Sequence, residues 1–422
     1  MKKKQYWYSL DNAAKVFPAV SSAKRASVFR LSFYLNESVD PLILEQAVNE
    51  VLPRFETFAV TLKSGLFWYY IAANKRHFKV KEESPIFCKF VPWAENNGYL
   101  FSVYYYENKI TLETFHSLSD GTGAMEFLKS ITYTYYKLRG FTLDHEGIII
   151  SQSPYSMEET SDMFVNSYDL SNKMKLKEEP AYHITGEKFS KNFTLAVRMK
   201  ASTDQLLELT RNNQATIGEY VAALMAYSIY TQIPDKNKLK RPIKMFIPVN
   251  LRKYFKSKTL RNFSLYIKVT FSPKVAWDFE SMLSETKKQF KEQLNKEDLH
   301  ARMNSNVGIE KNPLVRLLPL PIKNLGFKLG YYFLAENINT FSISNLGNVK
   351  LPNAMNELIQ DIDFSIGGTN MGIASVHGHT NLLLNTQFKD ISIIQTFIKH
   401  LTDAGLDLQI DTNYREGLDE IL

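Results

Sequence analysis

The sequence is almost without cysteine. Cys88 is the only one in 422 residues, so the chain can form neither an internal disulfide framework nor a zinc site built from several thiolates. This scarcity is typical of proteins from a reducing compartment. Cys88 itself lies in the apolar run 86–91, where a buried thiol is usually unreactive.

The sequence also lacks a long apolar run. A membrane-spanning helix needs about 18 or more uncharged apolar residues, and the nearest stretch, 221–233, is shorter and follows Glu219. Residues 1–10 are basic and then aromatic, but Ser9 and Asp11 interrupt the apolar character that a secretory signal needs. We therefore expect a cytoplasmic protein without a membrane-spanning segment.

Several common catalytic motifs are missing. No phosphate-binding GxxxxGKS or GxxxxGKT loop and no GxSxG nucleophile elbow occurs. Gly121-Thr-Gly123 begins like a dinucleotide fingerprint, but Glu126 occupies its third glycine position, which argues against a nicotinamide cofactor. His377 and His379 flank a turn glycine without an adjacent carboxylate, so we interpret them as turn residues and expect no metal.

Glycine and proline are scarce, at 18 and 15 residues, whereas 44% of the residues are hydrophobic. This composition excludes collagen-like and disordered chains, because a chain so rich in apolar residues can bury a core. At roughly 150 residues per domain, 422 residues predict two to three domains.

Acidic residues are absent from one basic stretch. Residues 236–261 contain ten lysines and arginines and no aspartate or glutamate, in a chain of net charge +7. Such a cluster is either a solvated surface or a docking site for the phosphates of an anionic partner. No helix-turn-helix, zinc-finger or RNA-binding signature accompanies it, so we do not expect a nucleic-acid partner.

Hydrophobic periodicity predicts alternating strands and helices in both halves of the chain. In the first half we expect strands 28–35, 58–62, 67–71, 99–106 and 109–115 and helices 41–51 and 124–138. In the second half we expect strands 193–199, 243–249, 263–270, 340–344 and 361–365, helices from 203, at 220–230, 279–294 and 391–404, and a hairpin around Gly378.

A polar, acid-rich stretch, 141–186, separates these halves and is typical of a linker or crossover. We therefore predict an N-terminal domain, 1–186, and a C-terminal domain, 187–422. The fold class is α/β, in an α+β two-layer arrangement in which each domain is a mixed β-sheet flanked by helices.

The most informative chemistry lies where a predicted strand meets a predicted helix. His116 ends strand 109–115, and a helix starts just after Gly121, so the imidazole is expected beside free helix amides. Histidine has a pKa suited to a general base. Asp120 can accept hydrogen bonds from turn amides or pair with an arginine. A single histidine at a strand end can equally be structural.

Four segments carry a family resemblance. His116-Ser-Leu-Ser-Asp120-Gly121 matches the HxxxDG signature of the acyltransferase superfamily that includes chloramphenicol acetyltransferase, peptide condensation domains and alcohol O-acetyltransferases. The other segments resemble family motifs in family order, and they are 51–58, which contains Arg54, 247–252 with 261–263, and 341–347, which contains Ser344-Asn345-Leu-Gly347. The chain is similar above all to bacterial alcohol O-acetyltransferases and polyketide-associated acyltransferases.

The resemblance implies two chloramphenicol-acetyltransferase-like domains that form a pseudodimer with a tunnel at their interface. Because one chain then holds both halves, a monomer is expected. The implied reaction is direct transfer of an acyl group from acyl-CoA or an acyl carrier protein to a small alcohol or amine. The phosphopantetheine thioester is a co-substrate in that reaction, and no bound cofactor is implied.

The resemblance also implies roles for particular residues. His116 is the general base, Asp120 is structural with Arg54 as its salt-bridge partner, and Gly121 lets the substrate approach the helix end. Ser344 and Asn345 are candidates for stabilising the oxyanion, or they satisfy their own turn. The candidates for contacts with donor phosphates are Lys244, Arg252, Lys253, Lys256, Lys258 and Arg261, although Arg252 can instead be structural at the domain seam.

Two departures from the family pattern are visible. Phe115 stands where many condensation domains have a second histidine, which argues against a typical peptide-forming domain. The DFGWG motif of the plant branch is also missing. A noncatalytic relative that binds a carrier protein or acyl ligand as a scaffold is the alternative to an enzyme.

Residues 313–334 are apolar with interspersed bases and could touch a membrane or a lipid-like substrate. Pro319 and Pro321 interrupt any single amphipathic helix, so we expect a loop that packs on the core.

Overall fold

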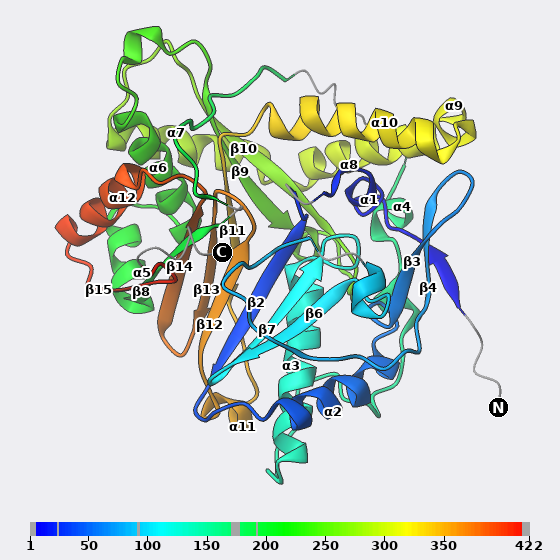
Figure 1. Cartoon of the computed structure of the whole chain (residues 1–422). Helices are drawn as coiled ribbons and strands as arrows, with labels where there is room; N and C mark the ends of the chain where they lie inside the picture. The colour runs from blue at the N-terminus through cyan, green and yellow to red at the C-terminus, as the bar shows by residue number, and fades with distance from the viewer. Residues whose placement is uncertain (1–5, 23–24, 91–92, 170–177, 191–192, 416–422) are drawn as a thin grey trace.

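The structure is a computed structural model that describes residues 6–22, 25–90, 93–169, 178–190 and 193–415, without the side chains of Trp93 and Leu334. Its architecture is α/β, with mixed sheets and flanking helices (Figure 1). This confirms the predicted fold class.

The N-terminal sheet holds the strand that leads to His116. It is five-stranded, in the order β12-β2-β7-β6-β5. Its strands are β2 (Val28–Leu35), β5 (Lys81–Glu82), β6 (Phe101–Tyr106), β7 (Lys109–Phe115) and β12 (Ile359–Ile366). Helices α2 (Pro41–Val51) and α3 (Gly121–Leu138) contribute apolar faces to the same core. The bounds of β2, α2 and β7 agree with the sequence prediction.

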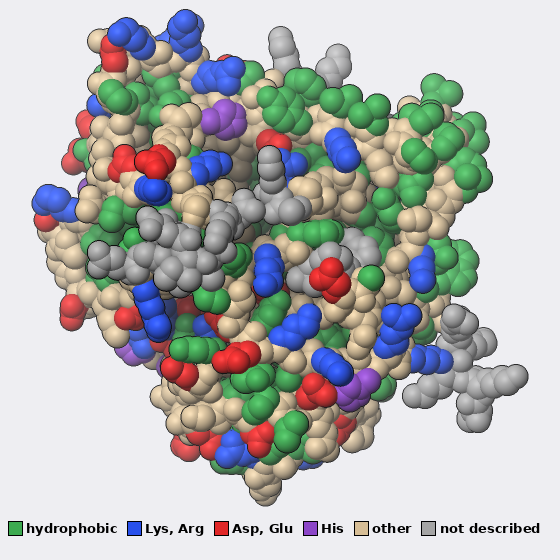
Figure 2. Space-filling view, in the orientation of Figure 1, with side chains coloured by type: hydrophobic (Ala, Val, Ile, Leu, Met, Phe, Trp, Pro, Cys, Tyr) green, Lys and Arg blue, Asp and Glu red, His purple; other side chains and the backbone are tan. Residues whose placement is uncertain are grey.

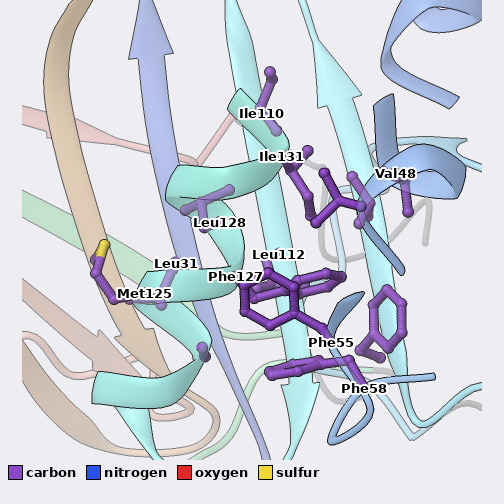
Figure 3. Packing of buried hydrophobic residues seen from close by; sticks show 14 of the residues in the cluster. Leu31, Val48, Phe55, Phe58, Ile110, Leu112, Met125, Phe127, Leu128 and Ile131 are labelled. Carbon is purple, nitrogen blue, oxygen red and sulfur yellow. The ribbon is translucent and has the colours of Figure 1, made fainter. Parts of the chain in front are cut away.

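Aromatic rings fill the space between α3 and the N-terminal sheet (Figure 3). Phe127 of α3 stacks on Phe58 with ring centroids 4.2 Å apart, and it also contacts Phe55 at 5.0 Å. Buried aromatic rings combine a large apolar area with specific edge and face contacts. This packing fixes α3, and therefore its N-terminal end, relative to β7.

The C-terminal sheet is seven-stranded, in the order β10-β9-β11-β13-β14-β8-β15. Its strands are β8 (Leu195–Ser202), β9 (Ile243–Asn250), β10 (Ser264–Phe271), β11 (Phe341–Asn348), β13 (Asn370–Val376), β14 (His379–Thr386) and β15 (Leu408–Thr412). The helices on this side are α5 (Thr203–Asn212), α6 (Ile217–Thr231), α7 (Phe279–Gln293) and α12 (Ser392–Asp403). Helix α6 starts with a capping box formed by Thr216 and Glu219 and is buried along most of its length.

One strand crosses between the two halves of the chain. β12 belongs to the C-terminal half, but it pairs antiparallel with β2 at the edge of the N-terminal sheet. Partly buried ion pairs join it to β8 of the other sheet, with Arg198 2.8 Å from Asp363 and Lys200 2.8 Å from Asp361. A domain boundary at residue 186 therefore assigns β12 to the C-terminal domain, although this strand pairs with β2 of the N-terminal sheet.

The crossover between the halves contains short helices, η3 (Met157–Thr160) and α4 (Met163–Asn166). A further three-stranded sheet, in the order β1-β4-β3, lies at the side of the N-terminal sheet (Figure 1). Its strands are β1 (Trp7–Ser9), β3 (Val60–Ser64) and β4 (Tyr69–Ala73). The predicted hairpin 58–71 is confirmed, with both strands shifted by two residues.

The apolar stretch 313–334 is helical, and the predicted loop is wrong. After α8 (Lys296–Lys311), the chain forms α9 (Pro313–Leu317) and α10 (Leu320–Tyr331), followed by the π-helical turn η7 (Tyr332–Glu336). Pro313 and Pro321 lie in the first turns of their helices, where proline is tolerated because its missing N–H is not needed. Within the described residues, no helix is long and apolar enough to cross a membrane.

Candidate active site

β7 and α3 together position His116. The strand ends at Phe115, and the His116 backbone N–H donates to the Ser27 carbonyl at 2.9 Å, which continues the pairing with β2 by one residue. After a short turn, Asp120 caps α3 by accepting the Gly123 N–H at 3.2 Å. An aspartate N-cap satisfies one of the free amides of the first turn. The capped helix start therefore lies four residues beyond His116.

Two aromatic rings enclose the His116 imidazole. Phe17 of the short helix α1 (Phe17–Val20) stacks on it with ring centroids 4.9 Å apart, and Phe29 of β2 lies 5.0 Å away at a steeper angle. This largely apolar enclosure lowers the pKa of His116 below its usual 6.5, because desolvation disfavours the imidazolium. The hydrogen bond with Asn262 and the charge of Asp120 oppose that shift. The histidine is therefore neutral at pH 7.

Asn262 determines which nitrogen of the imidazole carries the proton. Its Nδ2 donates to the His116 carbonyl at 2.8 Å and to Asp11 Oδ2 at 3.1 Å, so its Oδ1 faces His116 Nδ1 at 3.2 Å. A flipped amide would turn its oxygen toward two acceptors. Because Oδ1 can only accept, the hydrogen-bond network assigns the proton to Nδ1. Nε2, which has no hydrogen-bond partner in the described part of the chain, is then the basic nitrogen.

Asp11 holds Asn262 in this orientation. Its side chain is fully buried, with Oδ1 accepting the Ala14 N–H at 2.7 Å and Oδ2 lying 3.5 Å from Arg261 Nε. Burial raises the pKa of Asp11, and the Arg261 guanidinium opposes that shift. The N-terminal segment thus contributes both the ring that covers His116 and the carboxylate that orients its partner.

Asp120 links the two halves of the chain. Its Oδ2 accepts from Arg252 Nη1 at 2.7 Å and from the Phe263 N–H at 2.9 Å. Arg252 lies in the short helix η6 (Leu251–Lys253) and also donates to the carbonyls of Thr259 and Arg261. Asp120 is buried, Arg252 is largely buried, and both are fully hydrogen-bonded. The pair is therefore a positioning element and leaves Asp120 no free oxygen for a second base.

The predicted pair between Arg54 and Asp120 does not form. Arg54 makes a bidentate pair with Glu159 of the crossover, at 2.7 and 2.9 Å, and donates to the carbonyls of Ser153 and Pro154. Arg54 can bind the crossover at several points at once, because a guanidinium presents several donors in one plane. The salt-bridge partner of Asp120 is therefore Arg252, and not Arg54 as the resemblance implied.

Half of the expected phosphate-binding residues face inward, so that prediction is wrong for them. Arg252 is bound to Asp120, Lys244 is buried beside Glu178 and donates to the Glu179 carbonyl, and Arg261 is buried beside Asp11. Only three members of the set are exposed, namely Lys253, Lys256 and Lys258. The basic run is therefore partly internal structure.

The glycines at the start of α3 make room for the opposite half of the chain. A Cβ on Gly121 would lie 2.8 Å from Leu346 Cδ2 of β11, so this space holds a side chain. A Cβ on Gly123 would lie 2.1 Å from the Leu260 carbonyl oxygen. β11 thus reaches the helix end through Leu346. Its neighbours are the buried Ser344 and the exposed Asn345, whose Oδ1 accepts the Gly347 N–H at 2.7 Å.

Sequence reasoning missed Asn262, Asp11 and Phe17 as parts of the site. Asn262 lies in the segment 261–263 that resembles a family motif, which was the available signal. Asp11 and Phe17 carried no pattern of their own. Among the described residues, no group of three or more histidine, cysteine, aspartate or glutamate side chains could hold a metal ion.

No family model matches the sequence, and no curated protein matches it. The structure, in contrast, is similar to several solved structures over nearly its whole length. F. graminearum TRI101 complexed with ethyl coenzyme A aligns with a TM-score of 0.62 at 10% identity, covering 97% of this chain and 100% of that one.

Two further structures show the same arrangement. The starter condensation domain of rhizomide synthetase RzmA, in complex with C8-CoA and Leu-SNAC, gives a TM-score of 0.60 at 10% identity and covers 96% and 97% of the two chains. Trichothecene 15-O-acetyltransferase TRI3 from Fusarium sporotrichioides gives 0.56 at 12% identity and covers 95% and 94%. The resemblance inferred from the motifs is therefore confirmed at the level of the fold. This chain has the fold of the condensation domains and chloramphenicol-acetyltransferase-like acyltransferases.

Proposed function

We propose that this protein is an acyltransferase that moves an acyl group from a thioester to an alcohol or amine, with His116 as the general base. The observation that carries the proposal is the hydrogen bond between His116 Nδ1 and Asn262 Oδ1, which leaves Nε2 unprotonated. The fold supports it as well, because structures with this fold include an acetyltransferase and complexes with coenzyme A derivatives.

In the first step, His116 Nε2 accepts the proton of the acceptor hydroxyl while the acceptor oxygen attacks the thioester carbonyl carbon. A carbon–oxygen bond forms, and the carbonyl becomes a tetrahedral oxyanion. The Asn262 amide keeps the imidazole in place as it becomes an imidazolium, because Oδ1 continues to accept from Nδ1. An amine acceptor would lose its proton in the same way.

In the second step, the tetrahedral intermediate collapses and the carbon–sulfur bond breaks. The His116 imidazolium returns its proton from Nε2 to the departing sulfur, which leaves as a thiol. The products are an ester or amide and the free thiol, and His116 is again neutral. The lowered pKa of His116 keeps the neutral base available at pH 7 and makes its conjugate acid a stronger donor for the second proton transfer.

The oxyanion needs donors fixed near the carbonyl oxygen. Ser344 and Asn345 are the residues that we propose for this role. They lie on β11 next to Leu346, which contacts the start of α3 at Gly121. Asn345 uses its oxygen to accept the Gly347 N–H, so its amide nitrogen can act as a donor.

The donor thioester is proposed to be an acyl-CoA or an acyl carrier protein that enters a tunnel between the two halves of the chain. The exposed Lys253, Lys256 and Lys258 then contact donor phosphates, since exposed ammonium groups raise the local concentration of anions. One chain supplies His116 and Asn262 from different halves, so we propose that a monomer suffices.

The test is thiol release from acetyl-, butyryl- and palmitoyl-CoA, with and without a panel of alcohols and amines. Wild type is expected to release thiol only with a suitable acceptor. His116→Ala is expected to lower kcat by about 10²–10⁴-fold, the usual contribution of a general base. His379→Ala is the matched control, because this exposed histidine starts β14 in the C-terminal sheet.

If no acyl-CoA supports turnover, acyl carrier proteins loaded with the same acyl groups are tested next. Acceptor-dependent release from a carrier would assign the donor. Binding of acyl ligands without turnover from any thioester would support the scaffold alternative, and full activity of His116→Ala would exclude the proposed mechanism.

A further inference from the structure

Helix α10 turns its apolar side chains outward. Along α9, α10 and η7, eight large hydrophobic residues are exposed at spacings of one to four residues. They are Leu314, Leu317, Leu318, Ile322, Leu325, Leu329, Tyr332 and Phe333. These residues form a surface that we call the α9–α10 ridge. Figure 2 shows hydrophobic side chains along the upper edge of the molecule, over the position of α9 and α10 in Figure 1.

The inner side of α10 combines the buried Leu320 with a buried cation, which is unusual for a surface helix. Lys323 is 3% exposed and donates to the carbonyls of Phe67 and Arg316 at 2.9 and 3.0 Å. Its ammonium also lies 3.9 Å from the centre of the Trp68 ring. Burial lowers the pKa of Lys323. The helix is thus anchored through Leu320 and Lys323, and no described residue covers its exposed leucines.

The ridge continues onto the hairpin between β3 and β4. The Leu320 N–H donates to the Leu66 carbonyl at 2.9 Å, which ties the start of α10 to the hairpin turn. Leu66 and Phe67 of that turn are exposed, as is Trp7 of the neighbouring β1. A cavity of about 860 Å³, lined by Trp7, Phe67 and Arg316 among others, opens beside them. Apolar and aromatic groups therefore form one continuous surface.

The charges of this surface have one sign. Residues 312–335 include Arg316, Lys323 and Lys328 and no acidic residue. Of the acids that flank the stretch, Glu310 pairs with Lys15 and Glu336 pairs with Arg25. Arg316 and Lys328 are exposed at the edges of the ridge. An apolar helix face with exposed cations and no acid is complementary to lipid with anionic head groups.

We propose that the α9–α10 ridge docks this protein on the surface of an anionic phospholipid bilayer, with α10 lying in the plane of the interface. Ile322, Leu325 and Leu329 then enter the boundary between head groups and acyl chains. Arg316 and Lys328 contact the lipid phosphates. The inference does not depend on the proposed acyl transfer, because it concerns the outer face of α10, whereas α1 and the Phe17 ring that covers His116 pack against this helix from within.

The experiment is sedimentation of the full chain with phosphatidylcholine vesicles, with and without phosphatidylglycerol. Wild type is expected to sediment with the anionic vesicles and to be released by salt. Leu325→Asp/Leu329→Asp should weaken this binding by about 100-fold, since two apolar contacts are replaced by charges of the lipid's own sign. Arg316→Gln/Lys328→Gln should weaken it by about 30-fold, from about fivefold for each cation.

Leu42→Asp is the matched control, because Leu42 is 80% exposed on α2, away from the ridge. It should bind vesicles like wild type. All three variants change exposed side chains, and unchanged melting temperatures verify that they fold. Transfer to a water-soluble acceptor serves as a second readout and should be the same in Leu325→Asp/Leu329→Asp as in wild type.

Three results would overturn the inference. The first is a wild-type protein that binds neither kind of vesicle. The second is an equal loss of binding in the Leu42→Asp control. The third is a wild-type dimer without vesicle affinity that Leu325→Asp/Leu329→Asp converts to a monomer, because the ridge would then be covered by a second copy of the chain.

Discussion

Glycine and leucine have different environments in helices α3 and α10. At the start of α3, glycines allow the other half of the chain to approach, and a Cβ on Gly123 would meet the Leu260 carbonyl oxygen at 2.1 Å. In α10, Gly326 and Gly330 have nothing within 4 Å of an added Cβ. α3 buries Leu128 in the core, whereas α10 exposes Leu325 and Leu329.

This contrast separates a part of the fold that forms a site from a part that presents a surface. Around α3, charged side chains form ion pairs with one another, as Asp120 does with Arg252. These ion pairs hold the backbone around His116 in place. In α10, the buried cation Lys323 anchors the helix from below. Changes near α3 should therefore affect stability and turnover, while changes on the outer side of α10 should affect neither.

The largest expected effect comes from breaking the link between α3 and η6. Arg252→Met should lower the free energy of unfolding by about 3–5 kcal/mol, because Asp120 is left as a buried charge without its partner. Denaturant unfolding measures the change. Adding Asp120→Asn should recover part of the loss, since the unpaired charge is then removed. No recovery in the double variant would contradict the ion-pair account.

A glycine pair compares the two helices directly. Gly123→Ala should lower the free energy of unfolding by about 3 kcal/mol, because the methyl group collides with the Leu260 carbonyl. Gly326→Ala should raise it by about 0.5–1 kcal/mol, because alanine is the better helix former and meets no neighbour. Thermal or denaturant unfolding of both variants measures the difference. Equal effects would mean that α3 is not tightly packed at its start.

Asn262→Ala tests positioning of the base. Without the amide, the imidazole can rotate or change tautomer, and kcat should fall by about 10²-fold, the cost of a small misplacement. KM should change little, because Asn262 contacts His116 and Asp11 rather than the space beyond Nε2. Steady-state kinetics on the thiol-release assay separates the two. A rise in KM with unchanged kcat would indicate a substrate-binding role instead.

The smallest expected effect is a shift of the pH profile. Because burial lowers the pKa of His116, kcat/KM should fall only when the pH drops below 6.5. Asn262→Ala should move this acid limb lower still, since the hydrogen bond favours the imidazolium. Asp162 near Asp11, with its pKa raised to about 6, titrates in the same range, so Asp162→Asn is the control. An acid limb above pH 6.5 would contradict the enclosed neutral histidine.

Local patterns predicted much of the fold. The bounds of β2, α2 and β7 follow from residues within a few positions of each other, and the start of α3 follows from Asp120 and the glycines after it. His116 and Gly121 are likewise close in the sequence, on either side of one short turn. These features depend on periodicity and capping, which the sequence displays directly.

One failure is local, because the prolines expected to interrupt a helix in 313–334 lie in the first turns of α9 and α10. The other failures concern contacts between distant segments. Arg54 and Arg252 are both plausible partners for Asp120, and only the folded chain shows that Arg252 is adjacent. In the basic run 236–261, Lys244 lies in the predicted strand 243–249, but only the folded chain shows that it is buried beside Glu178. β12 joins a sheet whose neighbouring strand is more than 300 residues earlier. Sequence spacing carries no information on such pairings.

The most direct measurement is the nitrogen NMR spectrum of His116 in the folded protein, assigned by its loss in His116→Ala. Our account predicts a neutral imidazole at pH 7 with the proton on Nδ1 and a basic Nε2, and it predicts that Asn262→Ala abolishes this preference. A proton on Nε2, or an imidazolium at pH 7, would contradict the claim that Asn262 presents His116 as a base.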